Sequence, residues 1–302
     1  MGVDLSERVV LSNGFREGAR YPAMFVNVTN RCTLSCAHCF VYRDDNPNEP
    51  APARREIPDD ELLEIIEGLR DRHGVQVMLW MGGEPLLRRR LVERGVRLFP
   101  HNTVVTNGTV PLVDLGADVL YVVSLDGPPG PNDAVRGAGT FDRVMRTLAR
   151  LPTGFSSPVQ VQCTVTRANQ DHLGELVELL RDTPVGWVTF SFYVPPAADA
   201  SGLGWATLED RMVAVETVRE LKQHHPGFVR NRGRALDLMA PGRAPVVTAA
   251  CPAKATVLPL YLDGERLVTP FCCYGNDVDC SRCGAWVVFE LAAGRDAGAP
   301  LG

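Results

Sequence analysis

Three cysteines lie close together near the start of the chain. Cys32, Cys36 and Cys39 are spaced C-x3-C-x2-C in the segment NRCTLSCAHCFVY, residues 30–42. Three thiolates on zinc would need a fourth ligand to complete a tetrahedron, and His38 is poorly placed between two of the cysteines to supply it. A [4Fe–4S] cluster also ordinarily takes four cysteines, so three leave one iron open to an exogenous ligand. The spacing therefore predicts a metal site with one open coordination position.

A second group of cysteines lies near the end of the chain. Cys251, one of the adjacent pair Cys272 and Cys273, Cys280 and Cys283 supply four thiolates, the last two in a C-x2-C knuckle. We expect one member of the adjacent pair to be spare, because neighbouring cysteines do not readily bind one metal together. Four thiolates are a complete ligand set for a [4Fe–4S] cluster or for structural zinc, and the residue types leave both open.

Alternating strands and helices would position these cysteines. Six short segments are rich in β-branched and aromatic residues and bounded by Gly, Pro, Asn or Asp, which is typical of strands. They are residues 24–29, 75–81, 102–107, 118–124, 159–166 and 187–194. Amphipathic helical patterns separate several of them, at residues 57–72, 140–151 and 171–182. Strand, crossover helix and parallel strand together predict an α/β fold, either open or curled into a barrel.

Short distinctive motifs follow the predicted strands. After the cysteine loop come GGEP at 82–85, TNG at 106–108, SLDG at 124–127 and TRAN at 166–169. In both parallel α/β architectures, ligands bind at the carboxyl ends of the strands. We therefore expect these motifs and the first cysteine group to meet at one rim of the sheet.

The fifth predicted strand separates polar from apolar residues by period two. One face carries Gln160, Gln162, Thr164 and Thr166, and the other carries Val159, Val161, Cys163 and Val165. The alternation predicts a polar lumen and an apolar side facing helices. Cys163 is then a buried structural thiol, since free cysteine often behaves as a small core hydrophobe.

The composition is that of a globular enzyme. The chain has 302 residues, of which 45% are hydrophobic and 22% charged, and its formal net charge is -5. No nucleic-acid partner is indicated, because the one Arg-rich stretch, LLRRRLVERGVR, is typical of the solvated face of a helix. The sequence has no signal peptide and no run of about 18 apolar residues, which predicts a cytoplasmic protein without a membrane partner. Nine cysteines in a reducing compartment are expected to be metal ligands, catalytic groups or buried thiols.

The cysteine motif and the strand-end motifs together resemble the radical S-adenosylmethionine (radical SAM) superfamily. Its signature is C-x3-C-x-Φ-C with an aromatic residue at Φ, a place that His38 takes here. MGGEP and VSLDGPPGPNDAVRGAGTFDRVM resemble the superfamily's elements after the second and around the fourth strand. The likeness covers roughly residues 22–196 and implies a partial (β/α)6 parallel barrel. One departure is PND at 131–133, where many relatives carry His-Asp.

The resemblance implies a [4Fe–4S] cluster on Cys32, Cys36 and Cys39, with SAM chelating the open iron. An electron from the reduced cluster would cleave SAM to methionine and a 5′-deoxyadenosyl radical. The implied cofactor contacts are Gly82, Gly83 and Glu84 at the methionyl ammonium, Ser124 and Arg136 at the ribose hydroxyls and the carboxylate, Asn169 at the ribose or adenine, and Phe40 beside the adenine. Structural alternatives exist, namely a tight turn for the two glycines, a surface ion pair for Arg136 and core packing for Phe40.

The second cysteine group resembles the twitch extension of radical SAM enzymes, in which a hairpin and a following C-x2-C hold one auxiliary [4Fe–4S] cluster. LYLDGERLVTP is the hairpin-like segment. The stretch from Gly264 to Cys272 is longer than in the family pattern, and a zinc site is the alternative. The resulting organisation is a leader at 1–21, a barrel at 22–196, a helical connector at 197–250, a Cys-rich extension at 251–290 and a tail at 291–302.

Two classes of function fit these observations. The favoured one is a radical SAM enzyme that modifies a small molecule, such as a natural-product intermediate, by hydrogen abstraction. Peptide maturation and adenosyl transfer are alternatives within this class. Such an enzyme implies a reductase, flavodoxin or ferredoxin as electron donor. The second class is a non-catalytic zinc-binding α/β protein, against which the rim motifs argue. No general acid or base stands out, and the residues ahead of the first strand are too few for a peptide-recognition domain.

Overall fold

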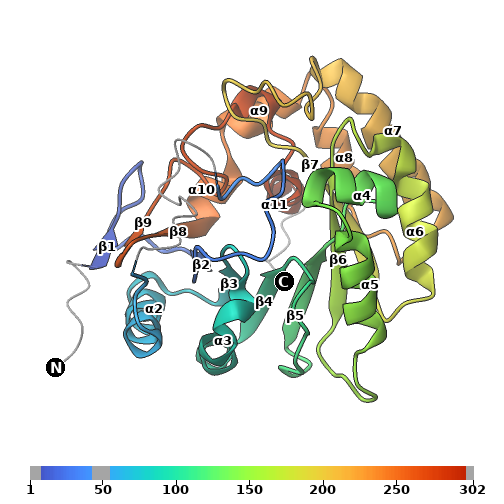
Figure 1. Ribbon diagram of the computed structural model, residues 1–302. Coiled ribbons are helices and arrows are strands. Elements are labelled where there is room, and N and C mark those ends of the chain that lie inside the picture. Colours follow the sequence, from blue (N-terminus) through green and yellow to red (C-terminus); the bar gives the residue numbers. More distant parts are fainter. Residues whose placement is uncertain (1–7, 43–54, 297–302) are drawn as a thin grey trace.

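One sheet organises the molecule. The structure, a computed structural model, describes residues 8–42 and 55–296, and within them the sheet has nine strands in the order β1-β9-β8-β2-β3-β4-β5-β6-β7. Figure 1 shows these strands forming a curved wall. The strands are β1 (Val9–Val10), β2 (Ala23–Asn27), β3 (Val77–Met81), β4 (His101–Thr106), β5 (Val119–Ser124), β6 (Val159–Val165), β7 (Trp187–Phe192), β8 (Val257–Asp263) and β9 (Arg266–Val268).

Strands β2 to β7 are the six strands that the sequence predicts. Each pairs in parallel with the next along the chain, from β2–β3 to β6–β7. Helices α2, α3, α5 and α6 lie outside the curve of the sheet (Figure 1). The predicted parallel α/β fold is confirmed, and its curvature makes it a partial barrel.

The three helices predicted from amphipathic patterns, α2, α5 and α6, fall where expected, with shifts of at most two residues at their ends. The described α-helices are α2 (Asp59–His73), α3 (Arg89–Gly95), α4 (Pro129–Arg136), α5 (Thr140–Ala149), α6 (Leu173–Arg181), α7 (Leu208–His224), α8 (Gly233–Leu238), α9 (Ala244–Ala249), α10 (Pro252–Thr256) and α11 (Trp286–Asp296). Four short 3-10 helices complete the set, η1 (Pro85–Arg88), η2 (Val96–Leu98), η3 (Gln170–His172) and η4 (Cys280–Arg282).

Strand β6 shows how the sequence separates the two faces of the sheet. Val159, Val161, Cys163 and Val165 are all buried in the main hydrophobic core, beneath the helices. Gln162 and Thr164 are only half-buried, on the opposite, lumenal face. The predicted alternation is confirmed, and Cys163 is a core thiol with no exposed surface.

The C-terminal hairpin joins the same sheet as the barrel strands. Strand β8 pairs in parallel with β2 and antiparallel with β9, and β9 in turn pairs with β1. Beyond the hairpin, α11 packs against α10, α8 and β7. At the end of β7, the backbone N–H of Phe192 donates to the Gly284 carbonyl at 2.9 Å. The Cys-rich segment therefore connects the two ends of the open sheet.

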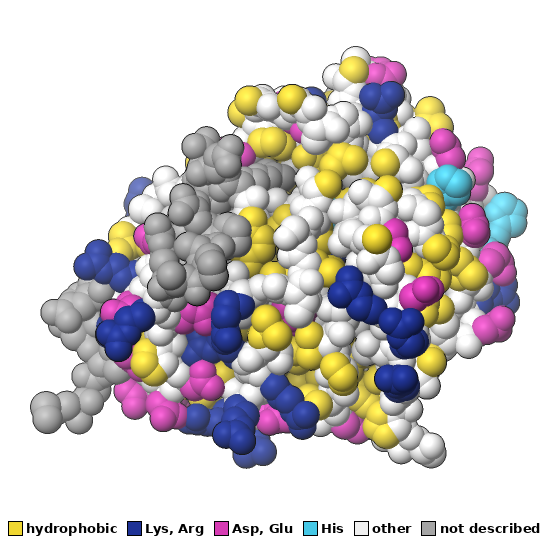
Figure 2. Space-filling model, viewed as in Figure 1, with side chains coloured by type: hydrophobic (Ala, Val, Ile, Leu, Met, Phe, Trp, Pro, Cys, Tyr) yellow, Lys and Arg dark blue, Asp and Glu magenta, His cyan; other side chains and the backbone are white. Residues whose placement is uncertain are grey.

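The Arg-rich stretch forms η1 and α3, and its side chains pair with carboxylates. Arg88 contacts Asp59 at 2.5 Å, and Arg94 contacts Asp60 at 2.6 Å. Figure 2 shows basic and acidic side chains interspersed on the α2 and α3 side of this face. Within the described ranges, no helix is long and apolar enough to cross a membrane.

Candidate metal and cofactor sites

The first cysteine group lies on the loop that follows β2. Cys32, Cys36 and Cys39 are half-buried, and the Cys39 N–H donates to the Cys36 carbonyl at 3.1 Å. Burial raises the pKa of Cys36 to about 11, with the positive charge of Arg136 opposing the rise and the Cys39 and Cys32 thiols adding to it. The three thiols are thus electrostatic neighbours. They would be deprotonated by binding a metal, which replaces their protons.

The GGEP loop after β3 holds the cysteine loop by its backbone. Gly83 N–H donates to the Thr29 carbonyl and Glu84 N–H to the Arg31 carbonyl, both at 2.8 Å. Gly82 has φ +152°, and a Cβ there would lie 2.6 Å from the Thr29 oxygen. A Cβ on Gly83 would lie 2.3 Å from the Arg31 oxygen. Only glycine permits this approach, because any side chain would push the two loops apart.

Glu84 links this loop to the end of β4. Its Oε1 accepts hydrogen bonds from the Leu86 N–H at 3.0 Å and the Thr106 hydroxyl at 2.9 Å. Its Oε2 accepts from the Asn107 N–H at 2.8 Å. The carboxyl is fully buried, and burial raises its pKa to about 7 despite these donors.

Asn107, in the TNG motif after β4, contacts a predicted metal ligand directly. Its Nδ2 donates to the Thr33 hydroxyl at 2.9 Å and lies 3.6 Å from the Cys32 sulfur. Its Oδ1 accepts from the N–H and hydroxyl of Thr109. One N–H of the amide thus faces the Cys32 thiol and lowers its pKa, although burial raises the pKa of this thiol overall.

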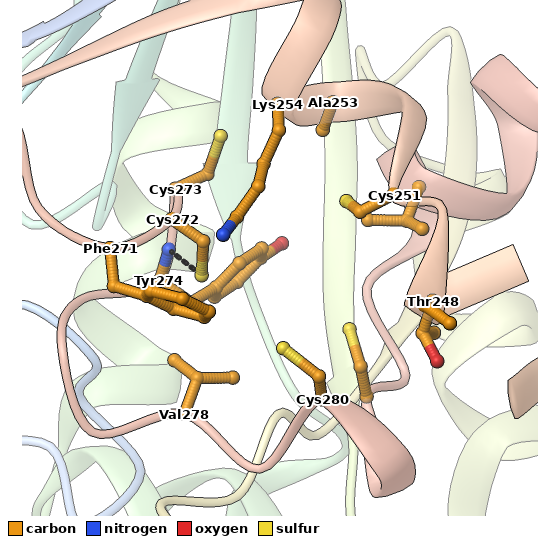
Figure 3. A pocket seen from close by; sticks show the side chains of 13 residues that line it. Thr248, Cys251, Ala253, Lys254, Phe271, Cys272, Cys273, Tyr274, Val278 and Cys280 are labelled. Carbon is orange, nitrogen blue, oxygen red and sulfur yellow. Dashed lines mark hydrogen bonds between the residues drawn. The ribbon is translucent and has the colours of Figure 1, made fainter. Parts of the chain in front are cut away.

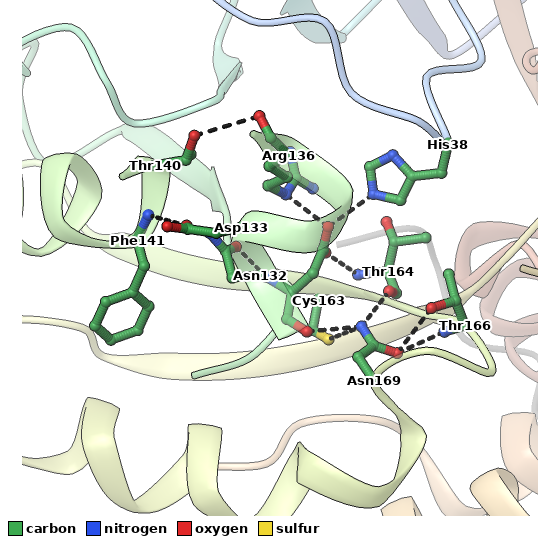
Figure 4. A network of polar contacts seen from close by, with 11 residues as sticks. His38, Asn132, Asp133, Arg136, Thr140, Phe141, Cys163, Thr164, Thr166 and Asn169 are labelled. Atoms are coloured by element: carbon green, nitrogen blue, oxygen red, sulfur yellow. Dashed lines mark hydrogen bonds and ion pairs between the residues drawn. The ribbon is translucent and has the colours of Figure 1, made fainter. Parts of the chain in front are cut away.

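Asp126, in the SLDG motif after β5, is the centre of a buried polar network (Figure 4). Its Oδ2 lies 2.7 Å from His38 Nε2 and 2.6 Å from Arg136 Nε, and its Oδ1 accepts from the Thr164 N–H at 2.7 Å. Burial alone would raise the pKa of the Asp126 carboxyl, but Arg136 and His38 hold this pKa well below its usual range. Asn132, from the divergent PND motif, accepts a hydrogen bond from the Asp126 N–H at 3.0 Å.

Two of the predicted cofactor contacts belong to this network. Arg136 is buried and paired with buried Asp126, so the surface ion pair considered for it is wrong. Asn169 accepts from the Thr166 N–H at 2.7 Å and donates to the carbonyls of Asp126 at 2.6 Å and Thr164 at 2.9 Å. Its amide therefore ties the end of β5 to the end of β6. Contact of either residue with SAM stays a prediction.

Phe40 and Ser124 lie at the same rim. The Phe40 ring stacks on Tyr274 of the C-terminal extension, with centroids 4.8 Å apart at an interplanar angle of 54°. This contact joins the two cysteine-bearing segments. Ser124 ends β5 and is half-buried, on the lumenal alternation of that strand. Their predicted contacts with adenine and ribose are not tested by these positions.

The C-terminal cysteines line one cavity of about 220 Å³. Its lining includes Cys251, Cys272, Cys273, Cys280 and Cys283. Burial raises the pKa of the Cys283 thiol to about 12, with the charges of Cys272, Cys251 and Cys280 adding to the rise. These four thiols are therefore close neighbours, although they come from three separate segments of the extension.

The side chains of the adjacent residues Cys272 and Cys273 point in different directions. In Figure 3 the sulfurs of Cys272, Cys251 and Cys280 face the cavity, whereas the Cys273 sulfur points away from that of Cys280. Cys273 packs against the cluster of Phe25 and Tyr261. The Tyr274 N–H donates to the Cys272 sulfur at 3.4 Å. This geometry favours Cys272 as the ligand.

Within residues 8–42 and 55–296, no three His, Cys, Asp or Glu side chains converge closely enough to hold a single metal ion.

Comparison with known proteins identifies the family. A family model described as the radical SAM superfamily matches residues 26–180, just over half of the chain. The chain belongs to the radical SAM superfamily. The match contains the first cysteine group and the GGEP, TNG, SLDG and TRAN motifs, so the superfamily predicted from these motifs is confirmed.

Several curated radical SAM proteins are similar in sequence. The chain is 29% identical over 226 residues to Fe-coproporphyrin III synthase of Methanosarcina barkeri, covering 68% of this chain and 53% of that protein. It is 32% identical over 162 residues to the mycofactocin maturase MftC of Mycolicibacterium smegmatis, covering 50% of this chain and 40% of the relative. The chain thus spans about half the length of the curated relatives it matches.

Solved radical SAM structures share the fold. Streptococcus suis SuiB bound to its precursor peptide SuiA superposes with a TM-score of 0.60 at 17% identity, covering 80% of this chain and 58% of SuiB. The structure of anSMEcpe with bound AdoMet gives a TM-score of 0.57 at 19% identity, covering 72% and 63% of the two chains. At these identities the likeness establishes the fold and not the substrate.

Sequence reasoning located the rim but missed three of its residues. Asp126 and Asn107 appear in the sequence analysis only within the SLDG and TNG motifs, and Tyr274 was not singled out. The available signal was position, because Asn107 and Asp126 follow predicted strands whose ends meet at the site.

Proposed function

We propose that this protein binds a [4Fe–4S] cluster through Cys32, Cys36 and Cys39, with S-adenosylmethionine at the iron that they leave open. When bound, the cluster supplies the electron that cleaves SAM to methionine and a 5′-deoxyadenosyl radical. The observation that carries the proposal is the presence of three neighbouring thiols on the loop after β2, at the carboxyl rim of a radical SAM barrel.

The surrounding residues prepare this loop for an anionic ligand set. Asn107 directs one amide N–H at Cys32, and Arg136 places a positive charge near Cys36. Asp126 fixes Arg136 and His38 in one network. Hydrogen-bond donors and cations around thiolates stabilise their charge, so these residues support cluster binding.

The proposed SAM site uses the same rim. The side chains of Glu84 and Asn169 form their hydrogen bonds with other groups of the protein. We therefore propose that these two residues position the loops of the site. The direct contacts then fall to the backbone of Gly82 and Gly83 at the ammonium, with Arg136 and Ser124 at the carboxylate and ribose. Phe40 is placed to cover the adenine.

We propose a second, auxiliary [4Fe–4S] cluster on Cys251, Cys272, Cys280 and Cys283. Support comes from the shared cavity and from the mutual electrostatic influence of the four thiols. With four thiolate ligands this cluster would have no open iron, so its role is electron relay and not substrate binding. Structural zinc is the alternative that metal analysis decides.

The substrate we propose is a small, largely uncharged molecule, from which the radical abstracts hydrogen. On β5, β6 and β7 the lumenal alternation carries hydroxyls and amides. Ser124, Gln162 and Thr164 are half-buried, whereas Gln160, Thr189 and Ser191 are buried. Opposite them, Phe25, Tyr261, Leu79 and Met81 form an apolar wall. A body with both apolar and neutral polar parts fits such walls.

A peptide substrate is the second candidate, and adenosyl transfer is a further alternative reaction. The peptide reading is favoured by the solved neighbour that binds a precursor peptide and by relatives named as maturases. The small-molecule reading is favoured by the relative named as Fe-coproporphyrin III synthase. Incubation with candidate substrates, followed by mass spectrometry, separates abstraction from adenosyl addition.

Nine cysteines, most of them in two groups with metal-ligand spacing, fit a protein of the reducing cytoplasm. We propose this location, with a reductase, flavodoxin or ferredoxin as the physiological electron donor. The electron donor is tested by incubating the reconstituted protein with flavodoxin, its reductase and NADPH and recording whether the cluster is reduced.

The direct test is SAM cleavage. Anaerobically reconstituted protein with dithionite should produce 5′-deoxyadenosine, and the variant with Cys32, Cys36 and Cys39 all changed to Ala should produce none. The variant should stay folded by circular dichroism, because the cluster loop lies at the rim and not in the core. Equal product from both proteins would overturn the proposal.

A further inference from the structure

A cation is buried beside the C-terminal cavity. Arg211, on the inner face of α7, is 1% exposed. Its guanidinium donates to the backbone carbonyls of Cys283 at 2.9 Å, Met239 at 3.2 Å and Arg282 at 3.4 Å. Its Nε has no hydrogen-bond partner. Arg211 thus holds the knuckle that carries Cys280 and Cys283.

Buried Arg211 has no anionic partner among the described residues. Across residues 8–42 and 55–296, no carboxylate is paired with Arg211, and the one ionisable group that acts on it is the Cys283 thiol. Burying an unpaired charge is costly, and protein interiors almost always compensate it. The missing anion is supplied if the neighbouring thiols are ionised.

A second cation reaches the same cavity from α10. Lys254 lies with its ammonium 3.3 Å from the centre of the Phe271 ring. Figure 3 shows the side chain directed into the cavity, toward Cys272. Lys254 lines this cavity together with Cys272 and Cys280. Lys254 is one of only two lysines in the chain, the other being Lys222.

We propose that Arg211 and Lys254 are the counter-charges of the metal centre on Cys251, Cys272, Cys280 and Cys283, and that Lys254 tunes its reduction potential. The inference rests on the auxiliary cluster proposed above. Four thiolates carry more negative charge than a cubane core cancels, so the centre is a net anion in both oxidation states. An added electron increases that negative charge. A nearby cation therefore stabilises the reduced state more than the oxidised state, and raises the potential.

The test isolates the C-terminal centre in the full chain. In a background with Cys32, Cys36 and Cys39 changed to Ala, reconstituted protein should hold about four irons. EPR-monitored titration with dithionite then compares Lys254→Met with Lys254→Arg and with Lys222→Met, a matched loss of the other lysine. Lys254→Met should lower the reduction potential of the centre by about 59 mV. For one electron this corresponds to an about tenfold higher ratio of oxidised to reduced centre at a fixed potential. The other two variants should stay within about twofold of the parent.

The outcomes separate the two proposals. Zinc in place of iron in the parent would refute the auxiliary cluster, and this inference with it. Four irons with an unchanged potential in Lys254→Met would refute the tuning alone, and would leave Lys254 as a packing partner of Phe271.

Arg211 supplies an independent readout. Arg211→Gln should lower the iron content of this centre at least twofold, whereas Arg211→Lys, which keeps the charge, should retain most of it. Circular dichroism and the iron of the first cluster, measured in the otherwise wild-type chain, report whether the barrel is folded. Full iron retention in Arg211→Gln would contradict its role as a counter-charge. If Arg211→Gln does not fold, the test uses Arg211→Lys instead. If Arg211→Lys loses as much iron as Cys280→Ala, the role of Arg211 as a counter-charge is contradicted.

Discussion

The two cysteine groups each have a buried arginine beside them, and the arginines are compensated differently. Near the first group, Arg136 is paired with Asp126 at 2.6 Å. Near the second, Arg211 donates only to carbonyl groups, and the described ranges place no carboxylate against it. The first site is therefore electrically balanced by the protein itself. At the second, we propose that a metal centre on the four thiolates supplies the missing negative charge.

The two sites also differ in their number of thiols, three at the first and four at the second. Three thiols leave a coordination position for a cofactor at the first site, and a polar network of Asp126, His38 and Asn107 surrounds it. Four thiols in a mainly apolar cavity complete the second site. This difference fits the proposal that the first site exchanges a ligand and that the second holds a permanent anionic group.

The largest expected effect separates the two sites by iron content. Changing Cys280 and Cys283 to Ala should lower the iron in reconstituted protein from about eight to about four per chain. The change that SAM produces in the EPR spectrum of the first cluster should persist, because its ligands lie on a different loop. Four irons and one zinc in the wild-type protein would contradict the second cluster.

Breaking the balanced site should cost stability. Asp126→Asn leaves buried Arg136 without its anion, and removing one partner of a buried pair commonly costs about 3–5 kcal/mol. Urea unfolding measures the loss. Glu93→Gln is the matched control, because Glu93 pairs with Arg89 on the surface of α3 and such pairs contribute about 0.2–1 kcal/mol. Equal losses in the two variants would show that the Asp126 network is not a buried charge pair.

The sheet and the rim were predictable from the sequence because both depend on local pattern. Period-two alternation on β6 separated its faces, and parallel topology placed GGEP, TNG and SLDG at one edge. The central role of Asp126 was not predictable, since its partners His38 and Arg136 are brought to it by separate elements. Strand β8 beside β2 and the choice between Cys272 and Cys273 likewise depend on long-range pairing and side-chain direction.

Glu84 predicts a pH effect at the first site. Its pKa is about 7 in the folded chain against 4.5 for an ordinary glutamate, because the carboxyl is buried. The folded state therefore binds the extra proton, and this contribution to stability is present below pH 4.5 and lost as pH rises through 7. The loss is at most about 3 kcal/mol. Glu84→Gln should remove this part of the pH dependence, measured by urea unfolding between pH 4.5 and 8. An identical slope in the variant would contradict a buried, neutral Glu84.

The smallest effect is expected at the spare cysteine. Cys273→Ala should keep the full iron content and lower the free energy of unfolding by about 1 kcal/mol, the cost of trimming a buried side chain. Cys272→Ala is its matched partner and should lose the C-terminal iron. The reverse pattern would assign Cys273 as the ligand and contradict the direction of its sulfur in Figure 3.

The central claim is that one site has an open position and the other does not. The most direct measurement adds SAM to two dithionite-reduced variants that each retain a single cluster, and records their EPR spectra. With Cys280 and Cys283 changed to Ala, SAM should alter the spectrum of the remaining first cluster. With Cys32, Cys36 and Cys39 changed to Ala, SAM should leave the spectrum of the C-terminal cluster unchanged. A SAM-dependent change in the second variant, or none in the first, would contradict the account.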